Sequence, residues 1–115
     1  MTSNSIFNSR EELLEATDLW RKDPTSAKAS YGDINTWDVS EITDFSGLFK
    51  DKATFDSNIG NWNVSNGTNF NSMFEGSTNF NQDIGSWNVS KGTDFNEMFA
   101  DATSFNQDIG DWDVS

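Results

Sequence analysis

Large apolar residues after position 33 recur every 25 residues along the chain. Aliphatic residues and Trp follow this spacing, and so do three sets of Phe: Ile34, Ile59, Ile84, Ile109; Trp37, Trp62, Trp87, Trp112; Val39, Val64, Val89, Val114; Phe45, Phe70, Phe95; Phe49, Phe74, Phe99; Phe55, Phe80, Phe105. A fixed period between about 20 and 50 residues is the signature of stacked repeat proteins. The pattern therefore predicts a stack of near-identical units.

Within one unit, the segment Ile59-x-x-Trp62-x-Val64 has the apolar spacing of the strand in a leucine-rich repeat. Trp62 and Val64 alternate with outward-facing Asn61 and Asn63, as a half-buried strand requires. Farther along, Phe70, Met73 and Phe74 fall at i, i+3 and i+4, which predicts a short helical turn. We therefore expect an α/β repeat solenoid, a leucine-rich-repeat-like right-handed coil with one short strand and one short helical turn per repeat of about 25 residues.

The first 32 residues lie outside this pattern. Ser9 and Glu12 form the ends of a capping box, and Leu13, Ala16, Thr17 and Trp20 then follow at helical spacing. This helix should end near Asp23, because Pro24 disfavours helical backbone in the residue before it. We expect residues 1–32 to form an N-terminal capping helix and a linker, the linker covering 25–31, and residues 33–115 to form about 3.3 coils of the solenoid, all in one domain.

At the other end of the sequence, the apolar residues Ile109, Trp112 and Val114 have no following unit to cover them. An apolar end with an open strand edge templates pairing with another chain. We therefore expect a protein partner or self-association, such as a two-fold tail-to-tail dimer, at this uncapped C-terminal end.

The repeated unit, clearest in Trp87-Asn88-Val89-Ser90, Met98-Phe99 and Phe105-Asn106-Gln107-Asp108-Ile109, resembles the BspA-like leucine-rich repeats of microbial surface proteins. The resemblance implies a binding or adhesion surface on a cell or particle exterior and no catalytic residues. Residues 1–10, however, lack the basic end and apolar run of a secretory signal. Gly67 and Gly92 stand where such repeats usually carry Val, either to make room for the larger Phe or to relax the turn.

Composition narrows the possible functions. Asp and Glu total 19 against 7 Lys and Arg, giving a net charge of −12, so nucleic acid and anionic membranes are repelled. No apolar stretch approaches the length of a membrane span. The chain has no Cys and no His, which removes thiolate and imidazole catalysis and the usual transition-metal ligands. We expect no enzymatic activity and no cofactor.

The candidate site is the set of outward polar positions, which the repeat arranges in rows, together with two apolar residues at the uncapped end. These partner-binding residues are Asp38, Asn61, Asn63, Ser86, Asn88, Asp111, Asp113, Trp112 and Val114. We expect a non-enzymatic protein-interaction, adhesion or structural module that presents this polar face within a larger exterior assembly. The alternative is binding of Ca²⁺, a glycan or ice by the repeated Asp, Asn and Thr positions. Four further residues, Asp33, Asn58, Asp83 and Asp108, offer oxygens to Ca²⁺ but are also typical turn residues.

Overall fold

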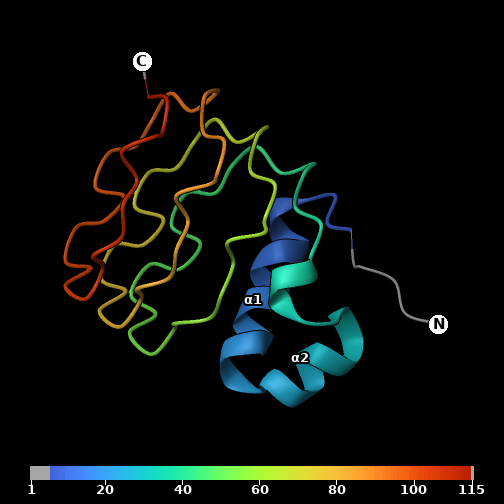
Figure 1. The fold of residues 1–115 in the computed structure, drawn as a ribbon. Helices are drawn as coiled ribbons and strands as arrows, with labels where there is room; N and C mark the ends of the chain where they lie inside the picture. Colours follow the sequence, from blue (N-terminus) through green and yellow to red (C-terminus); the bar gives the residue numbers. More distant parts are fainter. Residues whose placement is uncertain (1–5, 115) are drawn as a thin grey trace.

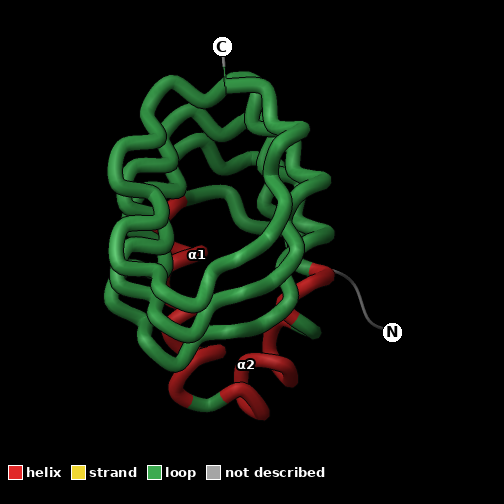
Figure 2. The backbone as a smooth tube through the Cα atoms, turned by 60° about the vertical axis from the view of Figure 1, so that its left-hand side comes forward, coloured by secondary structure: helices red, strands yellow, loops and turns green. Residues whose placement is uncertain are grey.

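Two α-helices precede a long stretch of turns and irregular backbone in the computed structural model, which describes residues 6–114. Helix α1 spans Arg10–Lys22, helix α2 spans Pro24–Tyr31, and a short 3-10 helix, η1, spans Ile34–Thr36. The remaining backbone winds in loops that lie on one another, with the helices at the opposite end from residue 114 (Figure 1; Figure 2). The molecule measures 41 × 26 × 22 Å. We call residues 33–57, 58–82 and 83–107 layers one, two and three.

The predicted α/β repeat solenoid is wrong. Residues 6–114 contain no β-strand and no sheet, and the β-type pairing between layers is limited to two isolated parallel bridges, Asp44 with Asn69 and Asn69 with Asp94. A leucine-rich-repeat-like right-handed coil needs a strand and a helical turn in each repeat, but none of the three layers has a strand and only layer one has a helical turn, η1. The architecture is two helices packed against stacked loops of irregular backbone.

In the segments predicted as strands, Asn and Asp side chains accept local hydrogen bonds from backbone N–H groups and form turns. In layer two, the amide oxygen of Asn63 accepts from the backbone N–H of Ser65 at 3.1 Å, and that of Asn58 accepts from Gly60 at 2.9 Å. Such turns compete with strand pairing for backbone donors. The link between layers here comes instead from the indole, because Trp62 Nε1 donates to the carbonyl of Ile34 at 2.7 Å.

The segments predicted as helical turns carry the hydrogen bonds between layers. Two residues per layer have positive φ, for example 57° at Ser72 and 73° at Gly76, which prevents a helix from continuing. Alternate backbone N–H groups then point along the stack, so that Phe70 and Phe74 donate to carbonyls of layer three at 2.8 and 2.9 Å. The apolar spacing was recognised correctly, but the backbone that presents it is not helical.

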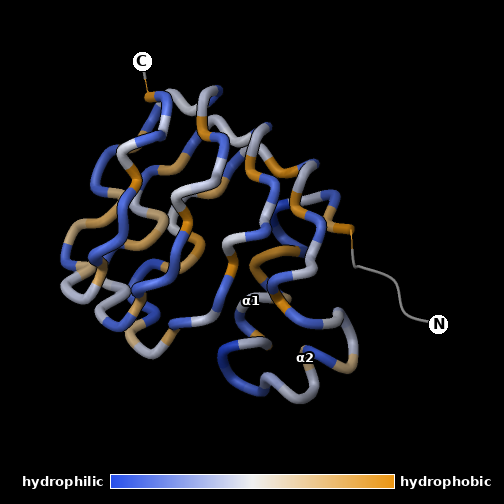
Figure 3. Tube along the Cα trace, in the orientation of Figure 1, coloured by the Kyte–Doolittle hydropathy of each residue, from blue (hydrophilic) through white to orange (hydrophobic). Residues whose placement is uncertain are grey.

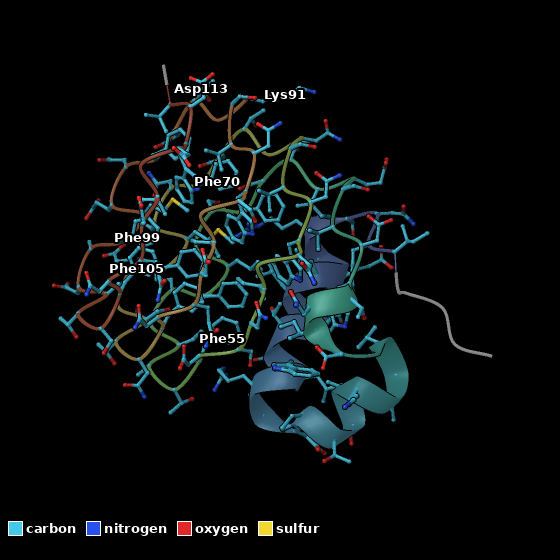
Figure 4. All side chains as sticks on the ribbon, in the orientation of Figure 1. Phe55, Phe70, Lys91, Phe99, Phe105 and Asp113 are labelled. Atoms are coloured by element: carbon cyan, nitrogen blue, oxygen red, sulfur yellow. The ribbon has the colours of Figure 1, made fainter. Side chains whose placement is uncertain are left out.

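The apolar positions of successive layers stack on one another and form the core. Stacked rings include Phe45 on Phe70 at 5.5 Å and Phe70 on Phe95 at 5.3 Å between centroids, and Phe80 on Phe105 at 5.9 Å. Within each layer a second pair packs more closely, as Phe74 does on Phe80 at 4.3 Å. Figure 3 shows the apolar positions recurring from loop to loop, and Figure 4 shows Phe55, Phe70, Phe99 and Phe105 among them.

Gly67 and Gly92 make room for the Phe rings, which settles one of the two alternatives from the sequence. A Cβ atom on Gly67 would lie 2.6 Å from Phe70 Cζ, and one on Gly92 would lie 2.3 Å from Phe95 Cζ. These distances are far inside van der Waals contact. Neither glycine is among those with positive φ, so the reason is space and not backbone freedom.

Helix α1 begins and ends where the sequence predicts. The hydroxyl of Ser9 accepts from the N–H of Glu12 at 3.2 Å, and the Glu12 carboxylate accepts from the N–H of Asn8 at 3.2 Å. The helix ends at Lys22, two residues before Pro24. Leu13, Ala16 and Thr17 are its buried residues, as the spacing predicts.

Helix α2 occupies the segment that the sequence analysis assigned to a linker. Asp23 caps it, because its carboxylate accepts from the Ser26 N–H at 3.2 Å and the Ser26 hydroxyl at 2.8 Å, and these bonds lower the pKa of Asp23. Pro24 occupies the first helical position, where its missing N–H costs nothing, and Gly32 ends the helix with a φ of 81°. Ala27 is its buried residue.

Helix α1 covers the free side of layer one. Trp20 packs edge-on against Trp37 with centroids 5.9 Å apart and donates from Nε1 to the Ser57 hydroxyl at 2.9 Å. The guanidinium of Arg10 donates to the backbone carbonyls of Asp44 at 3.1 Å and Ser46 at 2.5 Å. These carbonyls correspond to the ones that accept backbone N–H groups in layers two and three. Arg10 therefore takes the place of a preceding layer.

Replacing Arg10 with Ala should lower the free energy of unfolding by about 1 to 2 kcal/mol, because two carbonyl groups lose a charged donor. Replacement with Lys should recover only part of the loss, since an ammonium group does not match the fork of a guanidinium. Urea denaturation followed by circular dichroism measures both. Glu11→Ala on the exposed side of the same turn is the control, and an equal loss there would contradict a capping role for Arg10.

Candidate functional site

One side of the stack carries rows of polar side chains, which we call the polar side face: Thr36, Asp38, Ser40, Asn61, Asn63, Ser65, Ser86, Asn88, Ser90, Asp111 and Asp113. All predicted partner-binding residues except Trp112 and Val114 belong to it. Asn61, Asn63, Ser86, Asn88, Asp111 and Asp113 are exposed, and Asp38 is half-buried. Ser115, the last member predicted for one row, lies outside the described residues. The labelled Asp113 marks the last layer of this face in Figure 4.

Turn hydrogen bonds hold the polar side face in place. The carboxylate of Asp38 accepts from the N–H of Ser40 at 3.0 Å and from its hydroxyl at 2.5 Å. The hydroxyl first and the backbone N–H second lower the pKa of Asp38, so this carboxyl is held in its charged form. Asn88 makes the equivalent turn bond to Ser90 at 3.0 Å. Because the amide oxygens of Asn63 and Asn88 accept hydrogen bonds within their own turns, these two residues offer their amide NH₂ groups as donors to another molecule.

A shallow hollow of about 470 Å³ opens on the polar side face where layers one and two meet. Its lining is Asn35, Thr36, Trp37, Asp38, Ser40, Asn61 and Asn63. Asn35 joins the two layers there, since its amide oxygen accepts from the N–H of Asn61 at 3.0 Å. The hollow brings three of the predicted residues together: Asp38, Asn61 and Asn63. It can receive a polar group between a fixed carboxylate and fixed amides.

The C-terminal segment of the chain lies at the end of the stack away from α1 and α2 (Figure 1). The two apolar residues of the predicted site, Trp112 and Val114, belong to this segment. They belong to what we call the end face: Phe95, Met98, Phe99, Ile109, Trp112 and Val114, around a hollow of about 350 Å³. Val114 is 58% exposed. The structure thus divides the predicted site into two surfaces. Phe95, Met98 and Phe99 were not among the predicted site residues, although their apolar spacing was recognised.

The side-chain oxygens of the four candidate Ca²⁺ ligands accept hydrogen bonds from backbone N–H groups in turns. Asp83 accepts from the N–H of Gly85 at 2.9 Å and Asp108 from Gly110 at 2.8 Å, and Asn58 and Asp33 make the same bond in the earlier layers. Among residues 6–114, no group of three or more His, Cys, Asp or Glu side chains is placed to hold a metal ion.

The repeated Thr residues use their hydroxyls between layers. Thr68 Oγ1 donates to the carbonyl of Thr43 at 3.3 Å, and Thr93 Oγ1 donates to that of Thr68 at 3.2 Å. These hydroxyls are directed along the stack and are thus committed within the molecule. This arrangement makes the Thr row a poor candidate for binding ice.

A groove of about 390 Å³ lies between α1 and layer one, and it could not be predicted from the sequence because its two walls are far apart along the chain. Leu14 and Phe55 are among its apolar lining, and Asp18, Arg21 and Lys52 lie at its charged edge. Arg21 pairs with Asp18 at 2.8 Å, and Lys22 pairs with the same carboxyl at 3.1 Å. Hydrogen bonds from Lys22 and then Arg21 lower the pKa of Asp18. Two of the charged residues that line the groove, Asp18 and Arg21, are thus paired with each other.

Comparison with known proteins identifies a family. The family described as "Mycoplasma protein of unknown function, DUF285" matches residues 5–115. The chain belongs to this family. No curated protein and no solved structure matches the chain.

Membership of the DUF285 family assigns no activity, since its description states none. The match is to this family, and the more specific resemblance to BspA-like repeats is not established by it. In the described part of this DUF285 chain, no helix has the length and apolar character needed to cross a membrane. The polar side face and the end face are therefore the features of the molecule that bear on its function.

Proposed function

We propose that this DUF285 chain is a non-enzymatic protein-interaction module, of an adhesive or structural kind, that binds its partner through the polar side face. The observation that carries the proposal is the fixed set of polar groups around the hollow between layers one and two. Asp38 is held charged by Ser40, and the amide oxygens of Asn35 and Asn63 are held by hydrogen bonds. Groups that are already fixed lose little conformational freedom on binding.

The chemistry of the side chains also supports a binding role. The chain has no His or Cys, so the usual nucleophile and general-base pairs cannot form. The resemblance of the repeated unit to BspA-like surface proteins supports adhesion at a cell or particle exterior. The amide NH₂ groups of Asn63 and Asn88 favour a partner that presents carbonyl oxygens to them, and the net charge of −12 disfavours an acidic partner.

Capture of a partner with matched variants tests this proposal. The full chain is cross-linked in the cells that produce it, and each captured protein is then purified and its direct binding measured. The double variant Asn63→Asp and Asn88→Asp keeps the turn acceptors but removes the amide donors and adds charge. We expect it to weaken binding of the true partner at least about tenfold, equivalent to about 1.4 kcal/mol.

Asn79→Asp is the matched control, since Asn79 is equally exposed but lies beside Phe80 and outside the polar side face. Equal binding by the wild type, the double variant and the control would contradict the proposal. Calorimetry with Ca²⁺ addresses the alternative ligand class. Saturable Ca²⁺ binding that disappears in Asp38→Asn would favour that alternative over a protein partner.

A further inference from the structure

Layer two contains the only Asn-Gly pair in the sequence, Asn66-Gly67, directly after the polar side face. In such a pair the backbone nitrogen of the glycine attacks the side-chain amide of the asparagine more readily than in other pairs, because glycine has no side chain to hinder the approach. Layers one and three carry Glu41 and Lys91 at the position of Asn66. Asn66 is therefore the member of this row that is open to deamidation.

The packing of the core requires the glycine of this pair. A Cβ atom on Gly67 would lie 2.6 Å from Phe70 Cζ and 2.9 Å from Phe45 Cδ2. Both distances are far inside van der Waals contact. The stacked rings that exclude a side chain at position 67 thus also create the reactive sequence.

In the closed stack, hydrogen bonds engage both groups that would react. The amide Nδ2 of Asn66 donates to the carbonyl of Ser40 in layer one at 2.7 Å, and its Oδ1 accepts from the ammonium group of Lys91 in layer three at 3.0 Å (Lys91 is labelled in Figure 4). The N–H of Gly67 donates to the carbonyl of Val64 at 2.8 Å, and Gly67 is buried. The side-chain amide is therefore held by the neighbouring layers, and the attacking nitrogen is held in a turn away from water.

We propose that Asn66 is a latent deamidation site, which the closed stack keeps unreacted and which reacts when the layers separate. In the reaction, the Gly67 nitrogen bonds to Cγ of Asn66 while the Cγ–Nδ2 bond breaks, and Nδ2 leaves as ammonia with the proton of the Gly67 amide. Water then opens the cyclic imide at either of its carbonyls, which gives aspartate or isoaspartate. The inference does not depend on the polar side face or on its partner.

Neither product fits the closed stack. Aspartate at position 66 would set a carboxylate oxygen against the carbonyl of Ser40, which now accepts from the amide. Isoaspartate would insert an additional main-chain carbon directly before Gly67, which is packed between Phe45 and Phe70. Deamidation therefore marks a chain whose layers have opened and hinders their closure.

The test follows Asn66 in the full chain by peptide mapping with mass spectrometry, during incubation at mildly alkaline pH in buffer and in urea that unfolds the chain. We expect conversion at Asn66 to be at least about tenfold slower in the folded chain, because the reaction then requires the layers to open. Asn63 and Asn88 are controls within the same samples, since each is followed by Val, whose branched side chain hinders the attack. In urea they should convert much more slowly than Asn66.

Hydrogen exchange measures the opening itself. In urea below the unfolding transition, conversion of Asn66 and exchange of the Gly67 N–H should accelerate together, because both need the same separation of layers. Rates that change independently of each other would contradict the proposed control by opening.

Asn66→Asp copies the aspartate product. This variant should lower the equilibrium constant for folding about tenfold, because a carboxylate then faces the Ser40 carbonyl. Asn79→Asp, an exposed position in the same layer, is the control for the added charge. The inference is overturned if Asn66 converts as fast in the folded chain as in urea, or fails to convert in urea. It is also overturned if urea denaturation shows Asn66→Asp to be as stable as Asn79→Asp.

Discussion

Replacing Trp87 with Ala is expected to lower the free energy of unfolding by about 3 to 5 kcal/mol. Trp87 is buried at 4% exposure, stacks on Trp112 at 6.3 Å and contacts Phe74 at 6.2 Å between centroids. Its Nε1 donates to the carbonyl of Ile59 in layer two at 3.1 Å. The substitution therefore creates a cavity in the middle of the ring stack and also leaves a buried carbonyl without its donor. Urea denaturation monitored by circular dichroism, with the slope compared between variants, measures the loss.

Trp112→Ala is the matched control, because the residue occupies the same position one layer later. Trp112 also donates to a backbone carbonyl, that of Ile84 in layer three, at 3.0 Å. Unlike Trp87, however, it lies at the end face and is only half-buried. Its removal should cost about 1 kcal/mol, mainly through the lost hydrogen bond. Equal losses at the two positions in the monomeric chain would contradict an end face that lacks a covering layer.

The helices show which local signals can be recognised in a sequence. The start of α1 was predicted from Ser9 and Glu12, and its end from Pro24, because capping and proline act through neighbouring residues alone. Helix α2 was missed although its signals were also local: Asp23 as cap, Pro24 at the first position and Gly32 after the end. Pro24 marks the end of the first helix, but proline at a first helical position also favours the start of the next one.

The loops show what the apolar spacing alone does not determine. The positions of the core residues were predicted, and the rings of successive layers stack with the expected partners, as Phe49 does on Phe74 at 5.5 Å. The backbone conformation between these residues was predicted wrongly. Alternating apolar and polar residues fit any backbone that directs successive side chains inward and outward, whether or not it is a β-strand. Asn63 and its equivalents take the backbone donors that a strand would use. The sequence alone does not show that Asn side chains, and not a neighbouring strand, accept from these backbone N–H groups.

The polar side face and the end face also differ in how much of each could be predicted from the sequence. Outward positions such as Asn61 and Asn88 follow from the spacing of the buried residues, so the polar side face was predicted residue by residue. The backbone beside the end face depends on the φ angles of Glu97 and Asp101, which are 57°. Such angles are uncommon for Glu and more frequent for Asp, but neither residue requires them, so this backbone could not be predicted from the sequence.

Replacing Gly85 with Ala is expected to lower the free energy of unfolding by about 2 to 3 kcal/mol, a large effect for the addition of one methyl group. A Cβ atom at Gly85 would lie 2.6 Å from the backbone carbonyl oxygen of Asp108 in the following segment. Backbone cannot move aside there without separating the stacked rings of Trp87 and Trp112. Glycine is thus required for the close approach of two segments, since its φ lies outside the left-handed region.

Gly110 supplies the control for this prediction, since it occupies the same position after Asp108 that Gly85 occupies after Asp83. A Cβ atom on Gly110 would meet only the Asp108 carboxylate, at 3.1 Å, and no backbone from a later segment. Gly110→Ala should therefore change the free energy of unfolding by less than about 0.5 kcal/mol. A Gly85→Ala chain as stable as the wild type by urea denaturation would show that the segments can separate, and close packing between layers would then not explain the glycine.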